Sequence, residues 1–268
     1  MTHEVREPSD ARLALYRDLK DSARRRRAEL GEGVFVVEGR LALEAALTSS
    51  YSLLSVLALE RRLDVLSGLR IPEGVPVLVA SDEVMRTVTG FDVHRGLLAL
   101  ASRPTPTGPD ELLARQPASP VVVVEGINDQ ENLGSIFRNA AAFGAGAIFL
   151  DPTSSDPLYR RTVRVSLGLV LRVPFARLVP WPATLDLLRN EGFVLLALSP
   201  RAQAEPIAPV AHELKEERVA LVVGAEGPGL SASVLGQCRA VRVPMAPGAD
   251  SLNVAAATAV ALHRFSRV

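Results

Sequence analysis

The sequence predicts an α/β protein of two domains, with a parallel β-sheet flanked by helices in the C-terminal domain. Short apolar runs alternate with helical segments along the chain, which is typical of strand–helix–strand units. Residues 103–120 contain five prolines and little apolar periodicity, which indicates a semi-rigid linker. A length of 268 residues also favours two domains over one. We therefore expect a domain over 1–103, a linker over 104–119 and a second domain over 120–268.

The N-terminal domain is predicted to begin with a helix over residues 9–30. Leu13, Leu15 and Leu19 have helical spacing there, and Gly31 is a reasonable helix terminator. Four β-rich runs follow, with helical segments between them. The runs are 34–39, 53–59, 75–80 and 96–101, and the helices are 40–48, near 60–68 and near 81–88. This alternation predicts a small α/β domain.

The C-terminal domain is predicted to contain six strands that are apolar enough to be buried on both faces of a parallel sheet. The strands are 121–125, 147–150, 173–178, 193–198, 219–223 and 240–244, and the helices are 131–143, near 158–169, 182–190, a short one from Ser231 and a long one over 252–265. Ligands of such sheets bind at the carboxyl ends of the strands. Three loop segments are expected at that edge, namely residues 125–144, 222–231 and 243–254.

The composition is that of an ordinary globular protein, with 48% hydrophobic residues and a formal net charge of zero. The lone cysteine, Cys238, excludes an internal disulfide and a cysteine-rich metal cluster, so a reducing cytoplasm is the expected compartment. The polar N-terminus is unlike a secretory signal, and no apolar run is long enough to span a bilayer.

Arginine is concentrated in two stretches. Arg24, Arg25, Arg26 and Arg27 are consecutive, and residues 157–185 hold five arginines and no carboxylate. Arginine suits phosphate binding because its planar guanidinium can bind phosphate bidentately. The alternative for Arg24–Arg27 is a solvated helix face without a ligand.

Several common catalytic motifs are missing from the sequence. It contains no GxxxxGK[ST] loop, no GxGxxG between a strand and a helix, no HExxH and no GxSxG. The four histidines are scattered and have no metal-ligand spacing. The sequence therefore predicts no metal, no ATP and no covalent nucleophile.

Three loop-to-helix segments remain as candidates for chemistry: NLGSIFR (132–138), GAEGPGLS (224–231) and PMAPGADSLNV (244–254). Each has a structural alternative when taken alone. Asn132, Ser231, Ser251 and Asn253 are all suitable helix caps, and Arg138 and Glu226 suit an exposed surface.

Together, in this order and spacing, the three segments resemble the motifs of the SpoU/TrmH RNA methyltransferases. RVSLGLVLRVP (164–174) resembles a further stretch of that family, between its first and second motifs. FVVEG (35–39) and HRGLLAL (94–100) resemble its small, ribosomal-protein-like substrate-binding domain. At Gln130, Asn139 and Arg95 the sequence departs from the residues that are usual in this family. These differences bear on the identity of the substrate and leave the expected chemistry intact.

The resemblance implies a trefoil knot in the C-terminal sheet and S-adenosylmethionine as the cofactor, bound over loops 197–199, 224–229 and 243–253. The methyl group would pass to a ribose 2′-hydroxyl of RNA. Arg138 would clamp a phosphate and polarise that hydroxyl, and Asn132, Glu226, Ser251 and Asn253 would position the reacting groups. The expected cofactor-binding residues are Leu198, Gly224, Val243, Met245, Leu252 and Asn253.

The resemblance also implies a homodimer with an RNA site built from both subunits. RNA contacts are expected from Arg24, Arg25, Arg26, Arg27, Arg95, Arg160 and Arg161. Ribosomal RNA, and 23S in particular, is the expected substrate, because the additional N-terminal domain offers a second contact on a folded target. Two alternatives stay open: the same reaction on transfer RNA, and an RNA-binding protein on this fold that no longer catalyses.

Overall fold

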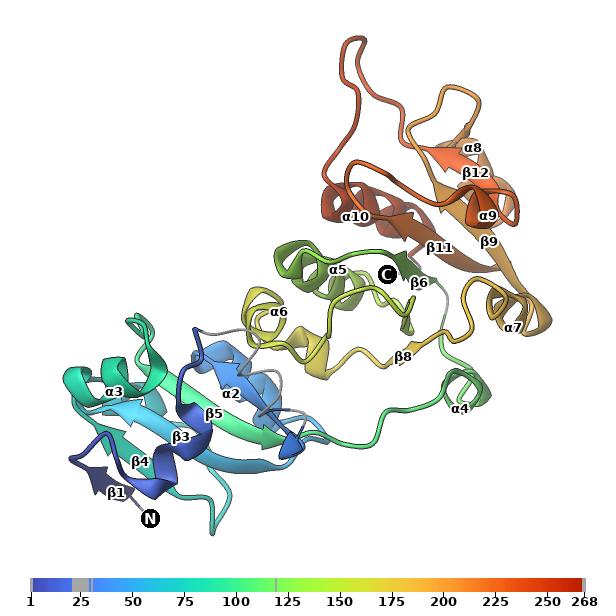
Figure 1. The fold of residues 1–268 in the computed structure, drawn as a ribbon. Helices are drawn as coiled ribbons and strands as arrows, with labels where there is room; N and C mark the ends of the chain where they lie inside the picture. Colours follow the sequence, from blue (N-terminus) through green and yellow to red (C-terminus); the bar gives the residue numbers. More distant parts are fainter. Residues whose placement is uncertain (1, 21–28, 30, 119, 267–268) are drawn as a thin grey trace. The chain divides into compact units, whose positions relative to one another are not determined.

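The computed structural model describes residues 2–20, 29, 31–118 and 120–266. The chain divides into two compact units (Figure 1). The first contains Met1–Thr105 and Leu158–Leu171, and the second contains Pro106–Pro157 and Arg172–Val268. The second unit has the parallel sheet between helices that the sequence predicts, so the fold class is confirmed. Residues 158–171, expected in the C-terminal domain, join the first unit.

The first unit is built on a five-stranded mixed sheet. Strands β1, β3 and β4 are parallel, and β5 is antiparallel to both of its neighbours. The spatial order is β1 (Thr2–Val5), β4 (Val77–Ala80), β3 (Leu53–Leu59), β5 (Leu97–Ser102) and β2 (Val34–Glu38). The sequence analysis missed β1, because its four residues, THEV, carry little apolar signal.

Four of the described helices of the first unit connect its strands. They are the 3₁₀ helices η1 (Ala11–Tyr16) and η2 (Glu60–Leu66) and the α-helices α2 (Arg40–Leu47) and α3 (Asp82–Thr89). The helix predicted over 9–30 is wrong over residues 9–20, whereas Glu29, near its predicted end, is helical. Asp10 caps a 3₁₀ turn that ends at Arg17, and Asp18 then has a φ of 53°, which is incompatible with a continuing helix. Its apolar spacing arises because Leu13, Tyr16 and Leu19 are buried in this unit's core.

Residues 158–171 pack on the first unit through an ion pair. In α6 (Arg160–Val165), the Arg160 guanidinium donates to Glu38, whose side chain is only 4% exposed. Arg160 also lies 4.4 Å from the centroid of the Phe91 ring, and Arg164 lies 3.6 Å from Glu38. Removing one partner of a buried ion pair typically costs about 3–5 kcal/mol. The pair therefore fixes this segment on β2.

The second unit contains a seven-stranded, entirely parallel sheet. Its order is β10 (Glu205–Pro206), β12 (Arg239–Arg242), β9 (Phe193–Leu198), β11 (Arg218–Gly224), β6 (Val121–Glu125), β7 (Ile148–Leu150) and β8 (Phe175–Arg177). The six predicted strands are all present. The seventh, β10, has only two residues and gives no recognisable sequence signal.

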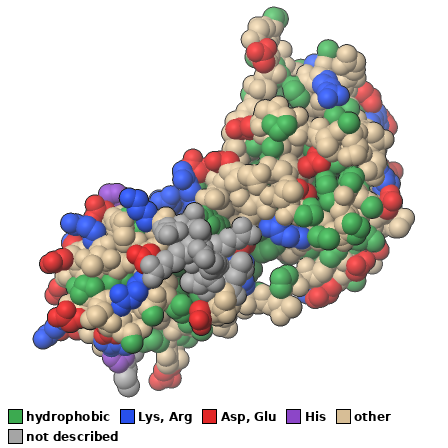
Figure 2. Space-filling model, in the orientation of Figure 1, with side chains coloured by type: hydrophobic (Ala, Val, Ile, Leu, Met, Phe, Trp, Pro, Cys, Tyr) green, Lys and Arg blue, Asp and Glu red, His purple; other side chains and the backbone are tan. Residues whose placement is uncertain are grey.

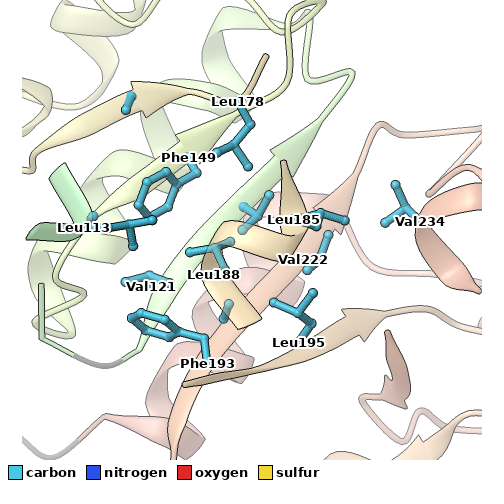
Figure 3. Packing of buried hydrophobic residues seen from close by; sticks show 14 of the residues in the cluster. Leu113, Val121, Phe149, Leu178, Leu185, Leu188, Phe193, Leu195, Val222 and Val234 are labelled. Atoms are coloured by element: carbon cyan, nitrogen blue, oxygen red, sulfur yellow. The ribbon is translucent and has the colours of Figure 1, made fainter. Parts of the chain in front are cut away.

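Helices cover both faces of this sheet. Residues of α4, α7 and α9 join one core cluster with alternate residues of the strands (Figure 3). Helix α10 packs on β11 and against α5 and α8. The helices are α4 (Pro109–Ala114), α5 (Gln130–Ala142), α7 (Leu185–Asn190), α8 (Ile207–Glu213), α9 (Ala232–Leu235) and α10 (Val254–Phe265). No helix among the described residues is long and apolar enough to cross a bilayer.

The predicted linker at 104–119 contains helix α4, which the sequence analysis missed. Leu112 and Leu113 of this helix are buried in the core of the second unit, so part of the linker belongs to that unit. Pro109 occupies the first turn of α4, where its missing N–H costs no helical hydrogen bond. The prolines that indicate a linker therefore also start a helix.

Asp151, directly after β7, organises the adjoining loops. Its carboxylate accepts hydrogen bonds from the backbone N–H groups of Gly126 (3.0 Å), Thr153 (3.1 Å) and Ser154 (2.9 Å) and from the two hydroxyls. Arg177 donates to carbonyl oxygens of the same turn at 2.8–3.1 Å. Burial alone would raise the pKa of Asp151, but the hydrogen bonds from Ser154, Thr153 and Gly126 outweigh it and lower the pKa.

Replacing Asp151 by Asn is expected to lower the free energy of unfolding by about 1.5–3 kcal/mol at neutral pH, because hydrogen bonds to a charged acceptor contribute about this much. The folded-state pKa lies below the unfolded value of about 3.9, so the stabilisation is present above that value. It is lost as the pH falls through the folded-state pKa.

Urea unfolding should therefore show that wild type has a higher free energy of unfolding than Asp151→Asn. This difference should be largest near neutral pH and should decrease on acidification. Asp186→Asn is the control, because Asp186 is 67% exposed and its ion pair with Arg189 should contribute little. A difference that does not change with pH would contradict this role of Asp151.

Candidate active site

The predicted functional loops meet at one edge of the second unit's sheet. Strands β6, β9 and β11 are neighbours and parallel, so their carboxyl ends lie together. Residues 126–129, 199–200 and 225–231 leave these ends, and residues 243–253 connect β12 to α10. Segments separated by more than a hundred residues in the sequence therefore surround one site.

A cavity of about 520 Å³ opens at this edge, within the size range of small-molecule sites. All six residues predicted to bind the cofactor line it. Ser199, which directly follows β9 and belongs to the predicted cofactor loop 197–199, also lines it. The predicted residues on its wall are Leu198, Gly224, Val243, Met245, Leu252 and Asn253. Their role in binding a cofactor stays a prediction.

The lining of this first cavity is largely apolar. Among its described lining residues one side chain is charged, that of Glu226, and polar groups come from Ser199, Ser251 and Asn253. Such a site suits a ligand with a flat uncharged part and a cationic centre near Glu226. It offers no cation to hold a phosphate.

A second cavity, also of about 520 Å³, lies next to the first. Ala225, Glu226 and Gly229 line both cavities, so the loop after β11 forms a shared wall. The remaining wall of the second cavity comes from the end of β6, the start of α5 and residues 228–231: Glu125, Gly126, Ile127, Asn128, Asp129, Asn132, Pro228, Leu230 and Ser231.

A hydrogen-bonded cluster joins all three predicted motifs. The side-chain amide Nδ2 of Asn253 donates to Asn132 Oδ1 (2.8 Å) and to Glu226 Oε1 (2.6 Å). The backbone N–H of Val254 also faces Glu226 Oε1, at 3.4 Å. The structure thus brings Asn132, Glu226 and Asn253 together at the boundary of the two cavities.

The helix caps differ in part from the sequence alternatives. Asp129, and not Asn132, caps α5, since its Oδ1 accepts from the backbone N–H groups of Glu131 and Asn132 at 2.8 Å. This leaves the Asn132 side chain available to Asn253. Asn253 does cap α10, through its Oδ1, and uses its Nδ2 for the cluster at the same time. The cap and the site residue are therefore one side chain.

Arg138 and Ser251 stand apart from this cluster. Arg138 is exposed on α5 and is not among the residues that line either cavity. Ser251 is exposed and lines the first cavity alone. The roles assigned to both remain predictions.

Glu125 supports the shared wall and was not recognised from the sequence. Its carboxylate accepts hydrogen bonds from Trp181 Nε1 (2.8 Å) and from the backbone N–H (2.8 Å) and hydroxyl (2.8 Å) of Ser231. Ser231 in turn caps α9. Glu125 therefore ties the far end of the 225–231 loop to β6. A glutamate at the end of a buried strand was the available signal.

Gly224 is required by the shape of the same loop. A Cβ at this position would lie 2.5 Å from backbone atoms of Gly229 and Leu230. Gly227 and Gly229 have φ values of 88° and 68°, in the left-handed region that favours glycine. The three glycines thus let the loop fold back on itself between the cavities.

The residues predicted to bind RNA have different surroundings. Arg24–Arg27 lie outside the described residues. Arg95 and Arg161 are exposed, whereas Arg160 is committed to its ion pair with Glu38 and has a side chain only 15% exposed. Among the described residues, no group of three or more His, Cys, Asp or Glu side chains is placed to hold a metal ion.

Comparison with known proteins identifies the family of this chain. The model of the SpoU rRNA Methylase family matches residues 119–263. A relative from Mycobacterium tuberculosis, described as an uncharacterized tRNA/rRNA methyltransferase, is 44% identical, over 98% of this chain and 91% of the relative. A 23S rRNA (guanosine-2′-O-)-methyltransferase of Acinetobacter baylyi is 29% identical, over 78% of this chain and 85% of its own length.

Among solved structures, an AdoMet-bound rRNA methyltransferase from Sinorhizobium meliloti has the same fold, with a TM-score of 0.78 and 24% identity over 98% of this chain and 97% of that one. The family match covers more than half of the chain and includes all three motifs. The predicted resemblance is confirmed, and the chain belongs to the SpoU rRNA methylase family.

Proposed function

We propose that this protein transfers a methyl group from S-adenosylmethionine to a ribose 2′-hydroxyl of RNA. The observation that carries the proposal is the Asn132–Asn253–Glu226 cluster, at the boundary of two cavities of ligand size. One cavity suits the methyl donor and the other the acceptor nucleoside. The boundary between them is where a methyl group would pass.

The residues of the first cavity fit S-adenosylmethionine. Apolar side chains such as Leu198, Val243 and Met245 suit an adenine ring, and Glu226 suits the positive sulfonium. When bound, the cofactor supplies a methyl group that its sulfonium charge has already activated. What remains for the protein is to align the hydroxyl with that methyl group and to remove the hydroxyl proton.

Arg138 is proposed to act from outside the two cavities. Its exposed position on α5 leaves the guanidinium available to clamp an RNA phosphate and to polarise the hydroxyl. Asn132 and Asn253 would orient the ribose and the Glu226 carboxylate, and Ser251 would contact the cofactor.

The proposed substrate is 23S ribosomal RNA, with transfer RNA as the alternative. The relative from Acinetobacter baylyi is a 23S rRNA 2′-O-methyltransferase, and the first unit offers a second contact surface for a large folded RNA.

We further propose that the protein acts in the cytoplasm as a homodimer. Basic and acidic side chains are interspersed on the face in Figure 2, so RNA binding would depend on local arginines.

S-adenosylmethionine and its demethylated product should each raise the melting temperature, since a ligand that binds only the folded state stabilises it by mass action. A ligand at 100 times its Kd should add about 2.7 kcal/mol. Scanning calorimetry with and without ligand measures this, and a metal chelator should not change the result. An unchanged melting temperature at millimolar ligand would contradict the cofactor site and favour a non-catalytic RNA-binding protein.

Incubating the protein with S-adenosylmethionine and unmodified transcripts of ribosomal RNA and transfer RNA should introduce 2′-O-methylnucleosides. Mass spectrometry of nuclease digests identifies both the nucleoside and the RNA. Methylation confined to transfer RNA would overturn the ribosomal assignment. Methyl groups found only on bases would overturn the ribose assignment.

Replacing Arg24–Arg27 together by Ser should weaken RNA binding and make it less sensitive to salt. Each phosphate contact contributes about 0.7–0.9 to the slope of log affinity against log salt, so four contacts would reduce that slope by about 3. Filter binding at several salt concentrations measures it. Arg239→Ser is the matched control, because Arg239 is paired with Glu205 and Glu213. An unchanged slope would mean that the four arginines form only a solvated surface.

A further inference from the structure

Among the described residues, one ionisable side chain lines both cavities. Of the three residues that line both, Ala225 and Gly229 have no titratable group, and Glu226 has a carboxylate. If the methyl donor occupies one cavity and the acceptor ribose the other, Glu226 borders both reactants. This placement rests on the proposed function.

Hydrogen bonds fix the orientation of the Glu226 carboxylate. Its Oε1 accepts from Asn253 Nδ2 (2.6 Å) and faces the backbone N–H of Val254 (3.4 Å). No hydrogen bond from a described residue reaches Oε2, and no described Arg or Lys forms an ion pair with this carboxylate. Oε2 therefore keeps its lone pairs for a ligand.

The four other residues with a predicted catalytic role are unsuited to accept a proton. The amides of Asn132 and Asn253 and the hydroxyl of Ser251 are neutral and very weakly basic. The guanidinium of Arg138 stays protonated in proteins and so has no lone pair to offer.

Two other carboxylates, those of Glu125 and Asp129, line the second cavity but not the first, and they are bonded to Ser231 and to the start of α5, respectively. Among the described residues, Glu226 is therefore the carboxylate that borders both cavities.

We propose that Oε2 of Glu226 is the catalytic base that takes the proton of the ribose 2′-hydroxyl. The 2′-oxygen bonds to the methyl carbon, the electron pair of the broken C–S bond stays on sulfur, and the hydroxyl proton passes to Oε2. A free ribose hydroxyl is a much weaker acid than a carboxylic acid. Its oxygen becomes positively charged as the new C–O bond forms, however, so its proton then becomes acidic enough for a carboxylate to accept.

The product carboxylic acid is readily reset. Glu226 is exposed, so water can remove the proton once the methylated RNA has left. Asn253 acts as a positioning residue in this scheme, since it fixes Oε1 and thereby directs Oε2. Arg138 keeps the separate task of binding a phosphate.

Glu226→Gln is the direct test, because glutamine keeps an oxygen for Asn253 and replaces Oε2 by an amide that cannot accept a proton. The single-turnover rate constant at saturating S-adenosylmethionine should fall by about 10²–10⁴-fold, the usual contribution of general base catalysis. Calorimetry should give an affinity for S-adenosylhomocysteine within about threefold of wild type, and filter binding should give the same for RNA. The RNA is the transcript that wild type methylates, and Asp186→Asn is the control for lost surface charge.

Chemical rescue provides a second, independent readout. Formate should raise the single-turnover rate constant of Glu226→Ala at least tenfold, because it supplies a small carboxylate at the vacated position. It should not raise the rate constant of Arg138→Ala or Asn253→Ala.

Three outcomes would overturn the role of Glu226. They are near-normal turnover in Glu226→Gln, a loss explained entirely by weaker ligand binding, and failure of formate to restore activity in Glu226→Ala. Absence of any RNA methylation by wild type would instead overturn the proposed function itself.

Discussion

The site depends on the hydrogen bonds made by the side chain of Asn253. Its Oδ1 caps α10, and its Nδ2 donates to Asn132 and Glu226. One amide thus fixes the start of the last helix relative to the start of α5 and the loop after β11. A neutral amide suits this position because it can donate and accept at once, which neither a carboxylate nor an ammonium group can do. Helix α10 is in turn anchored by packing on α5 and β11, so the amide is held from both sides.

The sequence predicted the parts of the molecule that local patterns determine. Buried parallel strands have long apolar runs, so all six of the longer strands of the second sheet were recognisable. Since parallel strands end at one edge, the meeting of the 224–231 and 244–254 segments followed from that prediction. The six predicted cofactor residues line one cavity for the same reason. Where the apolar pattern was weak, as in β1 and β10, the elements were missed.

Contacts between residues that are distant in the sequence could not be predicted. Nothing in the sequence around Arg160 indicates that it pairs with Glu38, 122 positions earlier, so the arginine was interpreted as an RNA contact. Similarly, Glu125 has no local signal for its bonds to Trp181 and Ser231. A side chain's partner depends on tertiary packing, while its residue type shows only which bonds it can make. The cap of α5 illustrates this limit, because Asp129 and Asn132 are both suitable residues and only one makes the bonds.

The division of the site into two cavities gives the loop after β11 its importance. An anion exposed in a shared wall would cost stability only if it were desolvated without a partner, and Glu226 remains accessible to solvent in the free protein. On binding, a cationic sulfonium in the first cavity would compensate the charge as water leaves. The same carboxylate would then be desolvated only when both ligands are present, which strengthens its interaction with the hydroxyl at the moment of transfer. This would couple proton removal to the filling of both cavities.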